Sequence, residues 1–523
     1  MTDDMSTAEI VAATLDRWDA LRREAGPRAG DERFREWFFE VAPVLAGLGD
    51  DADTHAFLAF EVASGLFDRG RAGDAFLVLR WLGRHFARDG FRVDTRVRAI
   101  MALTDTCAGR AVDRESVDLA VGVLRDVVDV VRAPADVRVE RAVCRALSGV
   151  AHLSGRGVTF DRATAREIAS RWRELAERSG GSTDPELRDR RAHALGNEAL
   201  LWLQADDEDR ARRLFAVITA EFGADPPGVS PDVDLWVGRA RHAPTVLDRF
   251  PVGEAGLRLD YLERQRHWDR RRRFTGLGFA RWLRDGAPRN HLRELVRQAR
   301  DRHRKSAGQV RAWLCAGEPF VLLLRNFDLT ERSGVAGDGW WRDPADPADH
   351  VQVINLSRAG RVLGELAAAV PLVVVASTTA GELELGPDFG QFTAPVRLYL
   401  PDETWFDTVS ALIAVADQVI VWAAELSAGL ARELDCLIAE RRTDDTLVVL
   451  DPSLADPVPG AVLPRTGGEP LTREHPALAA FAHVVDADEL DVPGSPPLAR
   501  VVDGLDAARR VPFEQRVARL TAR

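Results

Sequence analysis

Lysine is nearly missing from this chain of 523 residues, because only Lys305 among its 70 basic residues is a lysine. The phosphate-binding loop of ATPases needs a lysine between glycine and serine or threonine, and Lys305 follows Arg304. The sequence therefore excludes a Walker-type nucleoside triphosphatase. Cysteine is also scarce, with four widely separated residues: Cys107, Cys144, Cys315 and Cys436. This spacing disfavours a zinc ribbon or a disulfide framework, and predicts small buried residues in a reducing compartment.

Long hydrophobic runs and targeting signals are lacking too. The first residues are acidic and do not have the basic-then-apolar order of a signal peptide. The longest apolar run, near 367–376, contains Pro371 and is far shorter than the roughly 20 residues of a membrane helix. We expect a soluble cytoplasmic protein without a membrane partner.

The simple catalytic motifs are absent. The chain has no Gly-x-Ser-x-Gly, no His-Glu-x-x-His and no complete Gly-x-Gly-x-x-Gly after a strand, and its 11 histidines are scattered. We therefore expect neither a metal nor a resident cofactor.

Length and composition predict a multidomain globular protein, since one core rarely extends over so many residues. We divide the chain into a helical repeat domain (1–245), a basic helical connector (246–316), an α/β domain (317–490) and a C-terminal helical tail (491–523). For the third segment, strands alternating with helices predict a flavodoxin-like parallel sheet.

A repeat of about 45 residues runs through the first segment. Ala75, Ala120, Ala165 and Ala211 recur at intervals of 45, 45 and 46, and each is followed four positions later by an apolar residue: Leu79, Leu124, Ala169 and Phe215. Three of them have another alanine twelve positions earlier: Ala63, Ala108 and Ala199. This pattern suits two closely packed antiparallel helices, and it resembles the tetratricopeptide repeat, although that family repeats at about 34 residues. The resemblance implies a protein-binding surface; a plain helical bundle is the alternative.

Residues 263–311 carry 16 basic and 5 acidic residues, a net charge of +11 in a chain of net charge −12. Arginines alternate with aromatics at Trp268, Phe274 and Trp282, which is typical of nucleic-acid or phosphate binding. The alternative is a solvated connector that docks on the protein's own acidic domains.

Polar side chains gather where the predicted strands end. Arg325, Phe327 and Asp328 follow a strand at 319–325, and Ser377 follows one at 372–376. Ser427 and Glu433 lie at the start of a helix predicted at 427–442, after a strand at 417–422. Ligands bind beyond the carboxyl ends of strands in open α/β sheets, so these residues predict a site there.

Three ordered motifs carry a family resemblance. They are Pro319-Phe-x-Leu-x-Leu-Arg-x-Phe-Asp328, Arg397-Leu-Tyr-Leu-Pro-Asp-x-x-Trp405 and Gly429-Leu-x-x-Glu433-Leu434. Together they resemble the TIR (Toll/interleukin-receptor) domain, in a bacterial TIR-like branch, over about residues 317–455. The resemblance implies a signalling or antiphage-defence protein that self-associates and cleaves NAD, as substrate, between ribose and nicotinamide, with Glu433 as the catalytic residue.

The chemistry of the remaining residues suggests supporting roles. Ser427 caps the helix, Arg325 pairs with pyrophosphate, and Phe327 or Trp405 stacks on a ring. Structural roles are the alternative for Asp328 and Trp405. For Arg325 the alternative is an ion pair with Asp328 at the end of the strand. For Glu433 the alternative is a solvated residue paired with Arg432 or Arg441. Two rival functions stay open: a non-catalytic TIR-like scaffold, and an enzyme resembling nucleoside deoxyribosyltransferases.

Overall fold

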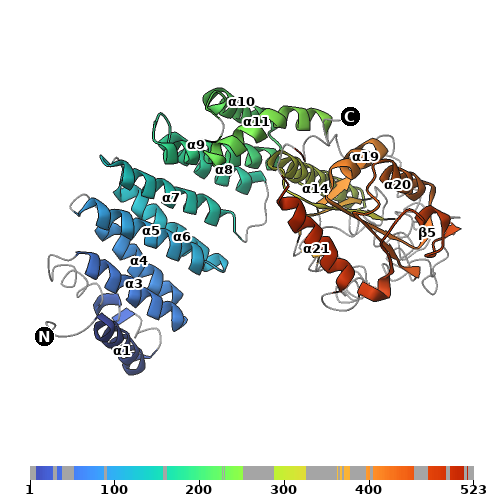
Figure 1. The fold of residues 1–523 in the computed structure, drawn as a ribbon. Helices are drawn as coiled ribbons and strands as arrows, with labels where there is room; N and C mark the ends of the chain where they lie inside the picture. The colour runs from blue at the N-terminus through green and yellow to red at the C-terminus, as the bar shows by residue number, and fades with distance from the viewer. Residues whose placement is uncertain are drawn as a thin grey trace. The chain divides into compact units, whose positions relative to one another are not determined.

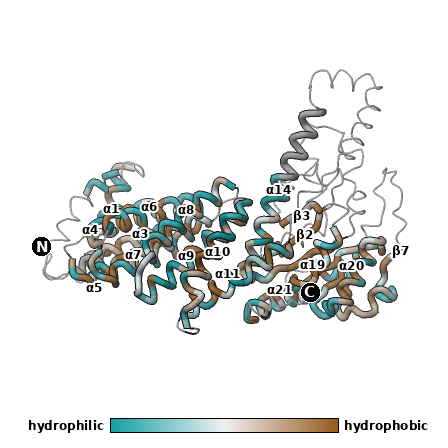
Figure 2. Tube along the Cα trace, turned by 90° about the horizontal axis from the view of Figure 1, so that it is seen from above, coloured by the Kyte–Doolittle hydropathy of each residue, from teal (hydrophilic) through white to brown (hydrophobic). Residues whose placement is uncertain are grey.

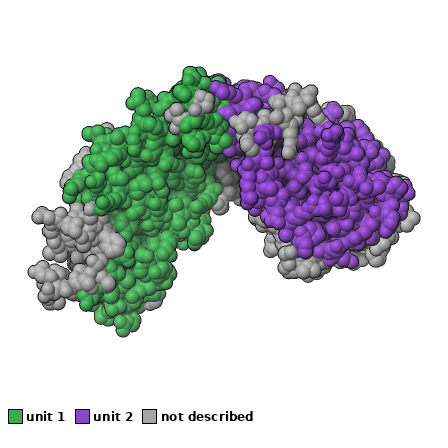
Figure 3. All heavy atoms as spheres, viewed as in Figure 1, with its two compact units in different colours: residues 1–202, 217–237 green, residues 203–216, 238–523 purple. Residues whose placement is uncertain are grey.

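The computed structural model divides the chain into two compact units, residues 1–202 with 217–237 and residues 203–216 with 238–523 (Figure 3). The structure describes the residues in these ranges: 7–26, 32–33, 35–37, 52–87, 91–132, 134–156, 162–226, 228, 230–250, 288–325, 362, 366–367, 370–376, 396–400, 405–452, 469–490, 495–511 and 515. Residues 251–287, which include the first half of the basic segment with Trp268, Phe274 and Trp282, lie outside them.

Helices follow one another through the first half of the chain, as predicted (Figure 1). After α1 (Thr7–Ala25), the described helices are α3 (Ala52–Asp68), α4 (Ala72–Phe86), α5 (Val93–Arg110), α6 (Arg114–Val130), α7 (Val137–Ser154), α8 (Arg162–Arg178), α9 (Pro185–Gln204), α10 (Glu208–Phe222) and α11 (Pro231–Arg249). Brown and teal residues alternate along these helices, as in amphipathic helices that bury one face (Figure 2).

The periodic alanines mark equivalent places in successive helices. Ala75, Ala120, Ala165 and Ala211 lie in α4, α6, α8 and α10, and each is at most 1% exposed. Their partners at four positions later are buried as well. The 45-residue period is therefore a repeat of helix pairs, in which a small side chain allows close approach of the neighbouring helix.

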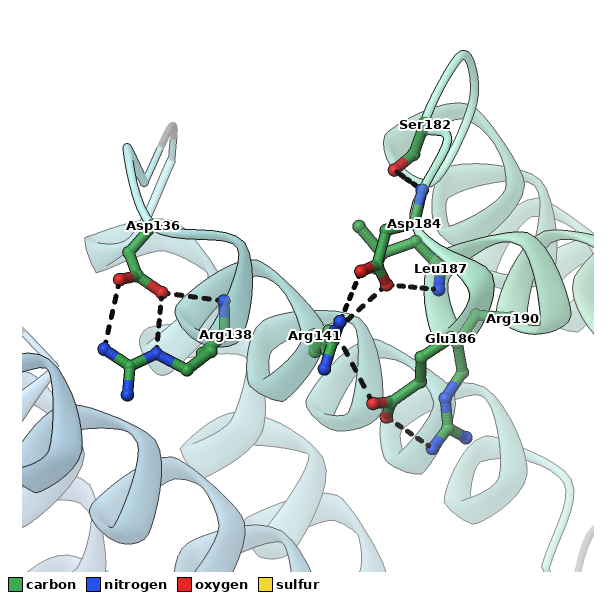
Figure 4. Close-up of polar contacts among 8 residues, drawn as sticks. All are labelled: Asp136, Arg138, Arg141, Ser182, Asp184, Glu186, Leu187 and Arg190. Atoms are coloured by element: carbon green, nitrogen blue, oxygen red, sulfur yellow. Dashed lines mark hydrogen bonds and ion pairs between the residues drawn. The ribbon is translucent and has the colours of Figure 1, made fainter.

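Ion pairs join one helix pair to the next on the side of the array shown in Figure 4. Arg141 of α7 binds the carboxylate of Asp184, the residue just before α9, and lies 3.7 Å from Glu186. Asp184 also accepts a hydrogen bond from the Leu187 amide and so caps α9. Arg141 holds the pKa of Asp184 below its usual value. The contact fixes the register of adjacent repeats.

Three of the four cysteines are buried, as their scarcity and spacing predict, and Cys436 is half-buried. Burial raises the pKa of the Cys107, Cys144 and Cys315 thiols to about 12, so these groups stay protonated. Among the described helices, none is long and apolar enough to cross a membrane.

The second half contains a six-stranded, fully parallel sheet. Its strands are β1 (Val321–Arg325), β2 (Leu372–Ala376), β3 (Val396–Tyr399), β4 (Gln418–Ala423), β6 (Thr446–Leu450) and β8 (Val484–Asp486). The helices described around them are α19 (Trp405–Val415), α20 (Ala428–Ala439) and α21 (Pro496–Arg509). Among these elements, β1, β2, β4 and α20 were predicted individually from the apolar runs and their boundaries. A two-stranded antiparallel sheet, β5 (Glu425–Leu426) with β7 (Glu469–Pro470), was not.

The strand order is β3-β2-β1-β4-β6-β8, which corrects the flavodoxin-like prediction. A flavodoxin-like sheet has the order 2-1-3-4-5, whereas numbering the six parallel strands along this chain gives 3-2-1-4-5-6, the order of dinucleotide-binding sheets. The difference is one extra strand, because β3 pairs outside β2 before the chain returns to β4 on the other side of β1. The alternation of strands and helices along the sequence does not specify the order of the strands within the sheet.

One face of the sheet packs against α21, which extends the core beyond the predicted end of the α/β domain. Val501 and Leu505 of α21 join a buried cluster with Leu323, Ile420 and Val449 of β1, β4 and β6. Residues 496–509 of the predicted tail therefore belong to the sheet's core.

Helix α14 (Pro288–Ala316) leads directly into β1 and packs within the same unit on the segments around residues 203–216 and 250. Arg311 lies 3.0 Å from Glu208 and donates to the carbonyl oxygen of Phe250 at 3.4 Å. Gly308 lies so close to Leu203 that an added Cβ would collide with that residue's carbonyl oxygen. Glycine at this point permits the close approach of the two backbones.

Candidate functional site

The chain reverses its direction across the sheet between β1 and β4. From β1 it proceeds outward through β2 to β3, then returns to β4 and proceeds the other way through β6 to β8. In open α/β sheets, ligands bind beyond the carboxyl ends of the strands at such a switch point. Arg325, the last residue of β1, pairs in register with Trp422 of β4 at this edge.

Helix α20 begins at this edge, after β4 and the short strand β5. Ser427 caps the helix as predicted, because its Oγ accepts a hydrogen bond from the Leu430 amide at 3.2 Å. Its backbone is extended, as an N-cap requires. The cap fixes where the first turn starts, and thereby where the side chains of the second turn lie.

The side chain of Glu433 lies on the buried face of α20. It is 2% exposed and shares this face with Leu430, Leu434 and Leu437. Side chains of a helix lean toward its N-terminus, and the N-terminus of α20 follows β4 at the carboxyl edge of the sheet. The alternative of a solvated glutamate is therefore wrong.

Burial raises the pKa of the Glu433 carboxyl from its ordinary value of 4.5 to about 8. Across the described residues, no hydrogen bond or ion pair reaches this carboxyl. An unpaired buried carboxylate is costly, so the group holds its proton near neutral pH. Perturbed carboxyl groups of this kind concentrate at functional sites.

Trp405 stands beside the first turn of α20. It is the half-buried first residue of α19, and its ring lies 3.7 Å from the place where a Cβ on Gly429 would be. Helices α19 and α20 lie side by side (Figure 1). The Arg432 guanidinium lies 4.0 Å from the Phe406 ring centroid and 5.7 Å from that of Trp405, which holds the two helices together.

The structure thus brings part of the predicted set together. Trp405, Ser427 and Glu433 lie on two adjacent helices, and α20 also contacts β1, which ends at Arg325. The side chain of Arg325 and all of Phe327, Asp328 and Ser377 lie outside the described residues.

Two buried acidic residues at the same edge were not predicted. Asp451, directly after β6, is 2% exposed and accepts a hydrogen bond from the indole of Trp422 at 3.1 Å. Glu425 is 6% exposed and pairs through its backbone with Pro470 of β7. An acid that immediately follows an apolar run, as Asp451 follows 447–450, was the available signal.

The Ser427 cap is testable by substitution. Ser427→Ala should lower the free energy of unfolding by about 1 kcal/mol, because the Leu430 amide loses its acceptor. Urea denaturation measures this change. Ser427→Asn, which supplies another capping oxygen, should restore most of the loss; an equal loss in both variants would contradict the capping role.

No group of three or more His, Cys, Asp or Glu side chains suited to a metal ion occurs within the part of the chain that the structure describes. Comparison with known proteins finds no matching family model, curated protein or solved structure, so the function has to be argued from the geometry of this edge.

Proposed function

We propose that the α/β domain binds NAD at the β1/β4 switch point and cleaves the bond between ribose and nicotinamide, with Glu433 as the catalytic residue. The observation that carries the proposal is the burial of Glu433 on the second turn of α20, a helix that begins at the edge where ligands bind in such sheets. The ordered motifs around Arg325, Trp405 and Glu433 support the same chemistry.

One carboxylate suffices for this reaction. Nicotinamide leaves a cationic nucleotide as a neutral molecule, so its departure needs no general acid. As the bond breaks, positive charge develops on the ribose, and an ionised Glu433 stabilises this charge and orients the ribose hydroxyl groups. Attack by water gives ADP-ribose, nicotinamide and one proton; attack by a second group of the nucleotide gives a cyclic product.

The helical array fits a sensing or assembly role in a bacterial signalling or defence protein. Its ion-paired helix pairs present an extended surface for a protein partner, and the α/β domain self-associates in the active form. The array is proposed to regulate the reaction and not to take part in it.

The direct test is NAD consumption by the purified, concentrated full-length protein. Nicotinamide should appear, and Glu433→Ala should slow its release by at least about 100-fold, because the developing charge loses its counter-charge. Asp435→Ala, at an exposed position of the same helix, should keep the activity. Circular dichroism of both variants checks that they fold.

Two results would contradict this proposal. Unchanged NAD under conditions in which the protein oligomerises would favour the scaffold function. Consumption of deoxynucleosides in place of NAD, again lost in Glu433→Ala, would favour a deoxyribosyltransferase-like reaction, in which the glutamate attacks deoxyribose as a nucleophile.

A further inference from the structure

The carboxyl of Glu433 has no positive partner within the described part of the protein. Its neighbours on the buried face of α20 are leucines. The adjacent arginine, Arg432, is exposed and lies over the Phe406 ring. Arg442, which follows the helix, binds the carbonyl oxygens of Ala416 and Asp417 and lies 3.1 Å from Asp445.

The elements packed on α20 offer few charges. Helix α19 carries Asp407, which is exposed, and β1 carries Arg325 at its last position. On α20 itself Asp435 is exposed. Burial therefore opposes ionisation of Glu433, and no cation among the described side chains is bound to its carboxyl group.

We propose that the ligand supplies the missing positive charge: Glu433 is the neutral acid in the empty site and ionises when an organic cation enters, so that binding releases a proton. This inference rests on the proposed function, for which the cation is the pyridinium ring of the oxidised nicotinamide nucleotide. The ring of the reduced nucleotide is neutral, so its binding does not favour ionisation of Glu433. The reduced nucleotide therefore binds more weakly.

The physical basis is the dependence of charge interactions on surroundings. A cation in contact with a desolvated carboxylate is attracted far more strongly than in water, and this attraction lowers the carboxyl pKa. Starting from a pKa of about 8, the carboxyl gives up its proton to solvent at neutral pH when the cation binds. No bond is made or broken in this step.

The test uses the full-length protein and two probes: a carbocyclic NAD analogue, which keeps the pyridinium ring but resists cleavage, and NADH. Calorimetric titrations at neutral pH in phosphate and in Tris, which differ in ionisation enthalpy, give the number of protons released. With the carbocyclic analogue we expect nearly one proton per site and a dissociation constant that falls about tenfold per pH unit below the folded pKa. NADH should show neither effect.

Glu433→Gln should bind both probes without proton release. Equal affinity for the two probes with no proton release in the wild type would overturn the inference, even if NAD is cleaved. Proton-linked binding of the analogue without NAD cleavage would support the inference and refute the catalytic proposal. If neither the carbocyclic analogue nor NADH binds, both the inference and the catalytic proposal are overturned.

Discussion

Replacement of Glu433 by glutamine should stabilise the protein, and the gain should grow by about 3 kcal/mol between about pH 6 and pH 9. The carboxyl has a pKa near 4.5 when exposed and about 8 when folded. Between these values the unfolded chain has lost its proton and the folded protein has kept it. Wild-type stability therefore falls by about 1.4 kcal/mol per pH unit and levels off above the folded pKa. Glutamine has no proton to lose.

Urea denaturation of both proteins across this pH range measures the gain, and all other titrating groups cancel in the difference. The matched control is Asp435→Asn, because Asp435 lies on the same helix but is exposed. Its stability relative to wild type should stay nearly constant with pH. A constant difference for Glu433→Gln as well would mean that the carboxyl is solvated in the folded protein, and would remove the basis of the proposed site.

Alanine at two mid-helix glycines should change stability in opposite directions. Gly122→Ala in α6 should stabilise by about 0.5–1 kcal/mol, because the space beside it is open among the described residues and alanine is the better helix former. Gly308→Ala in α14 should destabilise by about 1–3 kcal/mol, because its Cβ would collide with the Leu203 carbonyl oxygen and lie 3.1 Å from the Gln204 Cα.

Helix propensity is the same in both substitutions, so the difference in sign isolates the packing of α14. Hydrogen exchange gives a second measure: in Gly308→Ala, amides near the contacts of Arg311 with Glu208 and Phe250 should lose protection. Equal stabilisation by both alanines would show that α14 is not packed closely on this segment.

Local structure was predictable because it depends on neighbouring residues. The apolar runs of the second half located β1, β2 and β4, and a serine after a strand located the start of α20. The spacing of small residues located the helix pairs, since close helix contact needs a small side chain at a regular position. The tetratricopeptide type and the TIR resemblance stay predictions.

Contacts between distant segments were not predictable in this way. The sequence did not indicate that β3 lies outside β2, that β7 pairs with β5, or that Asp451 binds the Trp422 indole, since each depends on a segment returning from far along the chain. Because of the extra strand, the strand order is 3-2-1-4-5-6 and not the predicted flavodoxin-like 2-1-3-4-5. The switch point lies between β1 and β4.

The sequence by itself determined that this protein has no Walker lysine, that alanines recur every 45 or 46 residues in its first half, and that one glutamate follows a strand-like apolar run. These are matters of residue type and spacing along the chain. Only the tertiary structure decided the state of that glutamate. Because Glu433 shares the buried face of α20 with leucines, while Arg432 lies over the Phe406 ring, burial and not a neighbouring charge sets the pKa of Glu433.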